Sequence, residues 1–314
     1  MRAGKKRILL KVLLPAVVLL AVLLLAGCSR KSGTEKEEIQ ESGSEPVSAD
    51  QTGEDPLTVT PTEEPTPSPV LTEEPAPSGL AERLEELPAG TAVAEEEIDR
   101  TDLSRYFQSY EISDPLFARI YGDDRSYKTY CTVPREDLRY MKVLHYGYDG
   151  QIYVGELVVN ALLAEDIKAI FQELFENQYE IEKMHLIDDY GADDNRSIND
   201  NNTSCFNFRL ATNAGNLSNH AAGCAVDINP KQNPYYVILE DGSYVWENED
   251  AELYIDRTAA DAAERHMITH EDLCYQIFMQ HGFSWGGDWG NPVDYQHFEK
   301  VVYLAEMPDT AVAE

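Results

Sequence analysis

The sequence predicts an α+β fold in which helices flank a small antiparallel sheet, after a long disordered segment. Two observations carry this prediction. A hairpin pattern near residues 140–160 is followed by apolar residues at helical spacing over 164–177. Strands and helices are also mixed without the regular alternation of a βαβ fold, which favours antiparallel pairing. The chain has 314 residues, enough for one sizeable domain with tails.

The N-terminus, residues 1–28, has the layout of a secretory signal. Its basic residues come first: Arg2, Lys5, Lys6, Arg7 and Lys11. An apolar run, Val12–Leu25, follows and leads into Ala26-Gly27-Cys28. This end resembles the lipobox of bacterial lipoproteins, which implies that Cys28 is lipidated and that the protein is extracytoplasmic, lipid-anchored to the bacterial cell membrane. The alternative is an uncleaved transmembrane segment, because the run is only a little shorter than the ~17 residues of a span.

Residues 29–98 are predicted to form a disordered linker. Glu, Pro, Thr and Ser dominate this segment, and it has too few apolar side chains to offset the entropy of ordering. Prolines and like charges should keep it extended, so it gives the following domain reach above the lipid. Much of the formal net charge of -32 lies here. Such a charge repels DNA and RNA, so we expect no nucleic-acid partner.

A folded domain is predicted over residues 99–308, with a tail at 309–314. Its first hairpin turns at Asp149-Gly150, a pair suited to a tight turn. The helix at 164–177 has one apolar face, formed by Ile167, Ile170, Phe171, Leu174 and Phe175.

A second helix is expected near the C-terminus. The Thr269 hydroxyl would cap its start, with Asp272 three residues further on. Gly282 would end it. Its apolar face would consist of Leu273, Ile277 and Phe278.

Two turn-rich segments combine histidines with carboxylates. The first contains His220 and Asp227, and the second contains Asp294 and His297. A catalytic zinc site uses three His or Asp/Glu ligands and leaves one position for water. His220, Asp227 and His297 would supply two neutral imidazoles and one carboxylate, a set that leaves a single zinc ion with net positive charge. Asp294, three residues before His297, could then act as general base, although ordinary loop carboxylates and capped histidines would give the same pattern.

These segments resemble a known family. The stretch from about Leu138 to Lys300 is similar to the VanY-like zinc peptidases, which include D-alanyl-D-alanine carboxypeptidases and L-alanyl-D-glutamate endopeptidases. Their first motif, Ser-x-His-x-x-Gly-x-Ala-x-Asp, is matched at every fixed position by Ser218, His220, Gly223, Ala225 and Asp227. Their second motif, Asp/Glu-x-x-His, is matched by Asp294 and His297. The family shares a fold with the hedgehog signalling domain, so the resemblance implies that fold here.

The resemblance also implies roles for single residues. His220, Asp227 and His297 would be the zinc ligands, and Asp294 would be the catalytic base. Arg209 corresponds to an arginine that in the family contacts the substrate carboxylate or the developing oxyanion, and a forked cation suits both tasks. From the residues alone, a structural salt bridge of Arg209 is an equal alternative. Ser218 would either bind substrate or stabilise its own turn.

Four cysteines follow Cys28 in a compartment that permits disulfides: Cys131, Cys205, Cys224 and Cys274. They allow two bridges in three connectivities. We expect Cys205 to pair with Cys224, because both flank the first motif on strands that should be neighbours.

The favoured function is therefore a zinc-dependent peptidase that hydrolyses peptidoglycan stem peptides. A carboxypeptidase would need a cation for the terminal carboxylate, whereas an endopeptidase would need an open cleft, and the sequence leaves both open. The alternatives are a non-catalytic zinc-bearing module that recognises the cell wall or a protein partner, and a structural lipoprotein that tethers the wall. Nothing in the sequence indicates more than a monomer.

Overall fold

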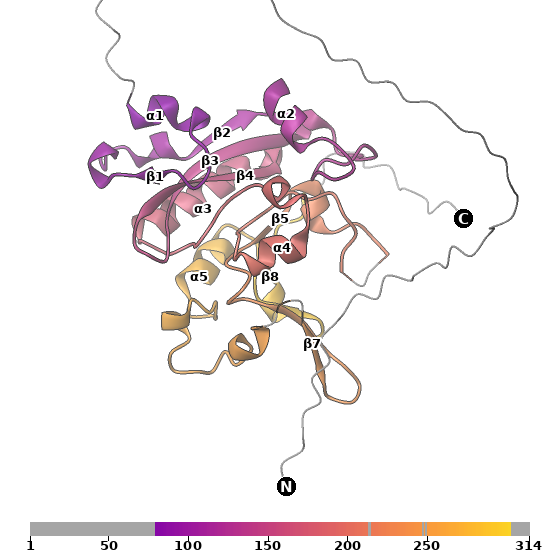
Figure 1. The fold of residues 1–314 in the computed structure, drawn as a ribbon. Helices are drawn as coiled ribbons and strands as arrows, with labels where there is room; N and C mark the ends of the chain where they lie inside the picture. The colour runs from indigo at the N-terminus through magenta and orange to yellow at the C-terminus, as the bar shows by residue number, and fades with distance from the viewer. Residues whose placement is uncertain (1–78, 213–214, 247, 249, 303–314) are drawn as a thin grey trace, which may run out of the picture. The chain divides into compact units, whose positions relative to one another are not determined.

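The computed structural model describes residues 79–212, 215–246, 248 and 250–302 (Figure 1). The predicted signal, Cys28, most of the predicted linker and the predicted C-terminal tail lie outside the described residues. Within the described part, no helix is long and apolar enough to cross a membrane.

The largest sheet has four antiparallel strands in the order β1-β4-β3-β2, and it forms the upper layer in Figure 1. Its long central strands are β3 (Leu138–Tyr146) and β4 (Ile152–Asn160). Its short outer strands are β1 (Ala92–Val93) and β2 (Gln108–Glu111). The turn between β3 and β4 contains Gly150 with a φ of 74°, a conformation that favours glycine. The predicted hairpin is confirmed.

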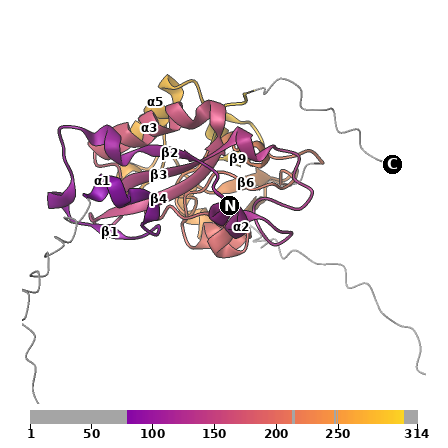
Figure 2. The same ribbon diagram turned by 90° about the horizontal axis from the view of Figure 1, so that it is seen from above.

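Helix α3 (Ala164–Glu176) packs against β3, as the view from above also shows (Figure 2). All five apolar residues of its predicted face are buried in the main core. Burial of this face explains why a segment with five charged side chains, Glu165, Asp166, Lys168, Glu173 and Glu176, forms a stable helix. The predicted helix is confirmed.

Helix α5 (Leu273–Gln280) packs against α3 but starts later than expected. Its N-cap is Asp272, whose carboxylate accepts a hydrogen bond from the Cys274 amide at 2.9 Å. The Thr269 hydroxyl accepts from the amide of Glu271 in the preceding turn. The prediction of a cap at Thr269 was therefore wrong, because the carboxylate nearer the apolar face satisfies the first free amides. Gly282, with a φ of 79°, follows the end of the helix as predicted.

Two further antiparallel sheets have three strands each, in the orders β5-β10-β8 and β7-β6-β9. Their strands are β5 (Ala225–Asp227), β6 (Tyr235–Ile238), β7 (Tyr244–Trp246), β8 (Ser284–Trp285), β9 (Val293–Asp294) and β10 (His297–Glu299). The remaining α-helices of the described part are α1 (Leu80–Arg83), α2 (Asp114–Ile120) and α4 (Asp194–Asn199). Small antiparallel sheets flanked by few helices confirm the predicted α+β class.

The folded part begins before residue 99. Leu80 and Leu84 are buried in the main core, and β1 pairs with β4. The ammonium of Lys142, itself buried, donates to the Leu87 carbonyl at 2.5 Å. Assigning residues 79–98 to the linker was therefore wrong. Their composition is acidic, and the helical spacing of Leu80, Leu84 and Leu87 is too short a pattern to predict a folded segment. Burial of Leu80 and Leu84 in the main core comes from contacts with distant segments.

The four described cysteines are free thiols, so the expected Cys205–Cys224 disulfide was wrong. Both side chains are buried in the main core. The Cys205 thiol lies 3.6 Å from the Gly223 carbonyl, and the Cys224 thiol lies 3.6 Å from the Ala222 carbonyl. They serve as small apolar side chains with weak hydrogen bonds.

We predict that Leu84→Ala lowers the free energy of unfolding by about 2–5 kcal/mol, because Leu84 is fully buried and the truncation leaves a cavity. Chemical denaturation measures this change. Leu162→Ala is the control, since Leu162 is 56% exposed and its truncation should cost less than about 0.5 kcal/mol. Equal, small effects of the two substitutions would contradict the placement of residues 79–98 in the fold.

Candidate metal centre

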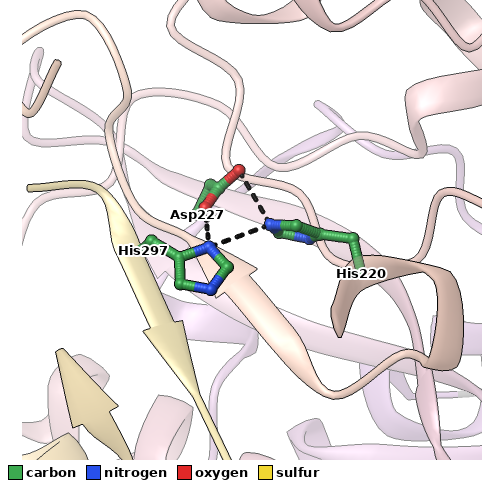
Figure 3. A group of neighbouring side chains, drawn as sticks. All are labelled: His220, Asp227 and His297. Carbon is green, nitrogen blue, oxygen red and sulfur yellow. Dashed lines mark hydrogen bonds and ion pairs between the residues drawn. The ribbon is translucent and has the colours of Figure 1, made fainter. Parts of the chain in front are cut away.

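Three short elements bring the predicted zinc ligands together. His220 lies on a 3₁₀ turn (Asn219–Ala222), Asp227 is the last residue of β5, and His297 is the first residue of β10. The two strands are antiparallel, and Asp227 lies directly opposite His297. All three side chains are buried and point toward one another (Figure 3). Among the described residues, they form the one group of His, Cys, Asp or Glu side chains close enough to share a metal ion.

Gly223 lets the turn that carries His220 approach the large sheet. Its φ is 66°, and a Cβ atom at this position would lie 2.6 Å from the backbone nitrogen of Asn160. Any other residue would strain the backbone and push the turn away from the end of β4. The glycine of the first motif is thus needed to place His220.

The three side chains have the spacing of a tetrahedral metal site. The Nε2 atom of His220 lies 3.2 Å from Nδ1 of His297 and 3.1 Å from Oδ2 of Asp227. Nδ1 of His297 lies 3.2 Å from Oδ1 of Asp227. Ligand atoms on a tetrahedral zinc, with bonds of 2.0–2.2 Å, are about 3.3–3.6 Å apart. The three distances here are slightly shorter, so a small outward shift of the side chains would let this donor set take one zinc ion with a position left for water.

The hydrogen bonds on the far side of each imidazole fix which nitrogen faces the site. Nδ1 of His220 lies 2.6 Å from the Cys205 carbonyl, which can only accept, so this nitrogen carries a proton and Nε2 faces the site. Nε2 of His297 lies 2.9 Å from a carboxylate oxygen of Glu299, so Nδ1 of His297 faces the site. Two imidazole nitrogens 3.2 Å apart need a proton or a metal ion between them.

Electrostatics agree with a site that attracts a cation. Burial opposes ionisation of Asp227, but the charges of His220 and His297 and their hydrogen bonds outweigh it and hold the pKa of Asp227 well below its usual range. Burial would likewise lower the pKa of His297, but hydrogen bonds to Asp227 and Glu299 raise the pKa to about 10. Without a metal, the cluster therefore holds a proton on His297. A metal ion would replace this proton.

Asp294 lies on β9 in the same cleft as the three ligands. It is 9% exposed, and its Oδ1 atom has no hydrogen-bond partner. Burial raises the pKa of Asp294 to about 6, and the charge of His297 offsets only part of that effect. A buried carboxylate oxygen without a donor is costly, so a water molecule or substrate group in the cleft would stabilise it.

The cleft around these residues has a volume of about 760 Å³. One wall is polar and contains the three ligands and Asp294. The β6–β7 hairpin supplies an apolar wall: Tyr235, Val237, Leu239 and Val245. These residues share one face because side chains alternate along a strand and Val237 pairs with Val245. The volume suits a short peptide segment.

Arg209 and Ser218 also line this cleft, and both have structural contacts. The Arg209 guanidinium forms an ion pair with Asp194, a residue that the sequence did not indicate. The Ser218 hydroxyl accepts from the amide of His220 at 3.3 Å and so caps the ligand-bearing turn. The structural alternative is therefore observed at each position. Contact of either residue with substrate stays a prediction, and both side chains line the cleft where it would occur.

Sequence reasoning missed Glu299 and Asn219. Glu299 accepts hydrogen bonds from His297 and from the Asn219 side chain. The position of Glu299 could have been found from the sequence, because residues two apart in a strand share a face and Glu299 is two residues after His297. Asn219 had no such signal, because its contact joins segments 80 residues apart.

Comparison with known proteins agrees with this site. Residues 212–300 match a protein-family model described as D-alanyl-D-alanine carboxypeptidase. The match covers less than a third of the chain, and it includes the three candidate ligands and Asp294. It supports a peptidase. Neither a search of curated proteins nor a search of solved structures found a match.

We predict that the purified protein retains about one zinc ion per chain after dialysis and that His220→Ala loses it, because two ligands cannot complete the site. Elemental analysis of the dialysed proteins measures this. His281→Ala is a matched control, since His281 also contacts carboxylates, Asp166 and Glu173, but does not line the cleft. If His220→Ala keeps as much zinc as the control, the assignment of His220 as a ligand is wrong.

Proposed function

We propose that this protein is a zinc-dependent peptidoglycan peptidase that hydrolyses stem peptides, as a D-alanyl-D-alanine carboxypeptidase or an L-alanyl-D-glutamate endopeptidase. One observation carries the proposal: the buried cluster of His220, Asp227 and His297 lies in one cleft with Asp294, whose buried carboxylate oxygen is unpaired. The family match over residues 212–300 supports the same class.

A zinc ion held by His220, Asp227 and His297 would polarise the scissile carbonyl and lower the pKa of a water molecule. The protein's own residues then act on the substrate and the proton. Asp294 takes the proton of the attacking water and returns it to the leaving nitrogen. Its raised pKa suits both steps near neutral pH, because a carboxyl group titrating there can accept and release a proton.

Among the described residues that line the cleft, Arg209 is the one arginine or lysine. Its guanidinium would bind a substrate carboxylate or stabilise the negative charge that develops on the scissile carbonyl oxygen. Asp194 holds the guanidinium by an ion pair, so this carboxylate both orients Arg209 and competes with a substrate anion. Ser218 keeps the turn of His220 in place, and its hydroxyl can also donate to substrate.

The location belongs to the proposal as well. The basic start, the apolar run and the lipobox-like end at Cys28 support secretion and a lipid anchor. An extended acidic linker would then carry the catalytic domain away from the membrane, toward the stem peptides of the wall.

Digestion of defined muropeptides, followed by mass spectrometry, tests the proposed function. We expect cleavage that a zinc chelator abolishes and that added zinc restores. Loss of a terminal D-alanine would identify a carboxypeptidase, and separation of L-alanine from D-glutamate would identify an endopeptidase. Absence of cleavage by zinc-loaded protein would contradict the proposal and favour a zinc-bearing binding module.

We predict that Asp294→Asn keeps zinc and loses turnover by roughly 10²–10⁴-fold, because an amide of nearly the same shape cannot take the proton. Zinc content and initial rates on the cleaved muropeptide measure the two effects. Asp288→Asn should leave both unchanged, since Asp288 does not line the cleft and pairs with the exposed His270. Wild-type turnover in Asp294→Asn would show that another group is the base.

A further inference from the structure

The carboxylate of Glu299 lines the same cleft and contacts His297 at the ring nitrogen that faces away from Asp227 and His220. A single oxygen, Oε2, accepts from Nε2 of His297 at 2.9 Å and from the side-chain amide of Asn219 at 2.7 Å. The side chain of Glu299 is 20% exposed, so it is largely shielded from water. We propose that Glu299 is a positioning residue that holds His297 in the orientation required for metal binding, with Asn219 holding Glu299 in turn.

The alternation of side chains along β10 brings Glu299 next to His297. Residues two apart in a strand project from the same face, so His297 and Glu299 lie together on the polar side. Phe298, between them, projects to the opposite side, where it is fully buried and stacks on Phe278 with ring centroids 4.3 Å apart. Packing of Phe298 in the core therefore fixes the position of both polar neighbours.

The contact decides which nitrogen of His297 can bind a metal. An ionised carboxylate only accepts hydrogen bonds, so Nε2 of His297 must carry a proton and Nδ1 must face Asp227 and His220. A carboxylate partner also makes the imidazole a more basic ligand than a neutral partner would.

The two histidine ligands are held in different ways. His220 donates to a backbone carbonyl, that of Cys205, at 2.6 Å, and no side-chain substitution removes this partner. His297 depends on a side chain. Asn219 precedes His220 in the chain, so its bond to Glu299 also ties the turn of one ligand to the strand of the other. Glu299 is thus the position at which a substitution changes metal affinity without removing a ligand.

The inference rests on the proposed metal site, and its test does not need peptidase activity. Zinc affinity of the full chain is measured by competition with a chromogenic chelator, for the wild type, Glu299→Ala and Glu299→Gln. We expect Glu299→Ala to weaken zinc binding roughly 10–100-fold, as loss of a ligand's hydrogen-bonding partner does at other zinc sites. Glu299→Gln should weaken it less, because the amide oxygen can accept both hydrogen bonds but carries no charge.

A matched control and a double substitution distinguish the positioning of His297 from a nonspecific loss of zinc affinity. Glu173→Ala removes a carboxylate that contacts another histidine, His281, at 3.2 Å outside the cleft, and its zinc affinity should equal that of the wild type. Asn219→Ala combined with Glu299→Ala should bind zinc as weakly as Glu299→Ala alone, because Asn219 acts through Glu299. The absorption spectrum of the cobalt-substituted protein should change in Glu299→Ala and not in Glu173→Ala.

Two outcomes would overturn the inference. One is zinc binding by Glu299→Ala within about twofold of the wild type, while circular dichroism shows a folded protein. The other is an equal loss of affinity in Glu173→Ala, which would indicate a general effect of removing carboxylates. A wild-type protein that binds zinc but cleaves no stem peptide would contradict the proposed function alone, and the affinities would still decide the role of Glu299.

Discussion

The antiparallel pairing of β5 with β10 is the constraint on which the site depends. It places Asp227 opposite His297, although the two residues lie 70 positions apart in the chain. A slip of one residue in this register would turn the side chains of one strand to the other face and separate these two candidate ligands. Gly223 brings His220, the third candidate ligand, to this pair, because its left-handed backbone lets the turn of His220 lie against the end of β4.

Burial of this cluster costs free energy that the surrounding core must offset. Two imidazoles and two carboxylates, those of Asp227 and Asp294, leave bulk water, and their mutual contacts recover only part of the desolvation cost. Strand β10 shows how the fold compensates: Phe298 is fully buried against Phe278, while its two neighbours face the polar side. Alternation along one strand thus joins the stability of the core to the geometry of the site.

Each error of sequence reasoning has a physical cause. The leucines of residues 79–98 are few, and their helical spacing covers only Leu80, Leu84 and Leu87, so contact with distant segments is what shows that they belong to the core. Cys205 and Cys224 are close in the fold, yet both thiols are taken up by apolar packing, which no count of cysteines distinguishes from pairing. The helix cap was assigned to Thr269 and not to Asp272 because both residue types are favoured at the N-cap. In the structure Asp272 caps the helix and Thr269 accepts a hydrogen bond in the preceding turn.

The sequence by itself determined the features that depend on residues close together in the chain. These are the α+β class, the β3–β4 hairpin, helix α3, and the two motifs that contain His220, Asp227, Asp294 and His297. These follow from periodicity and from residue types at short spacing. The tertiary structure alone decided which atoms face one another, which nitrogen of each imidazole faces the site, and that Glu299 hydrogen-bonds both His297 and Asn219. Such contacts join segments up to 80 residues apart, and their distances depend on the packing of the whole domain.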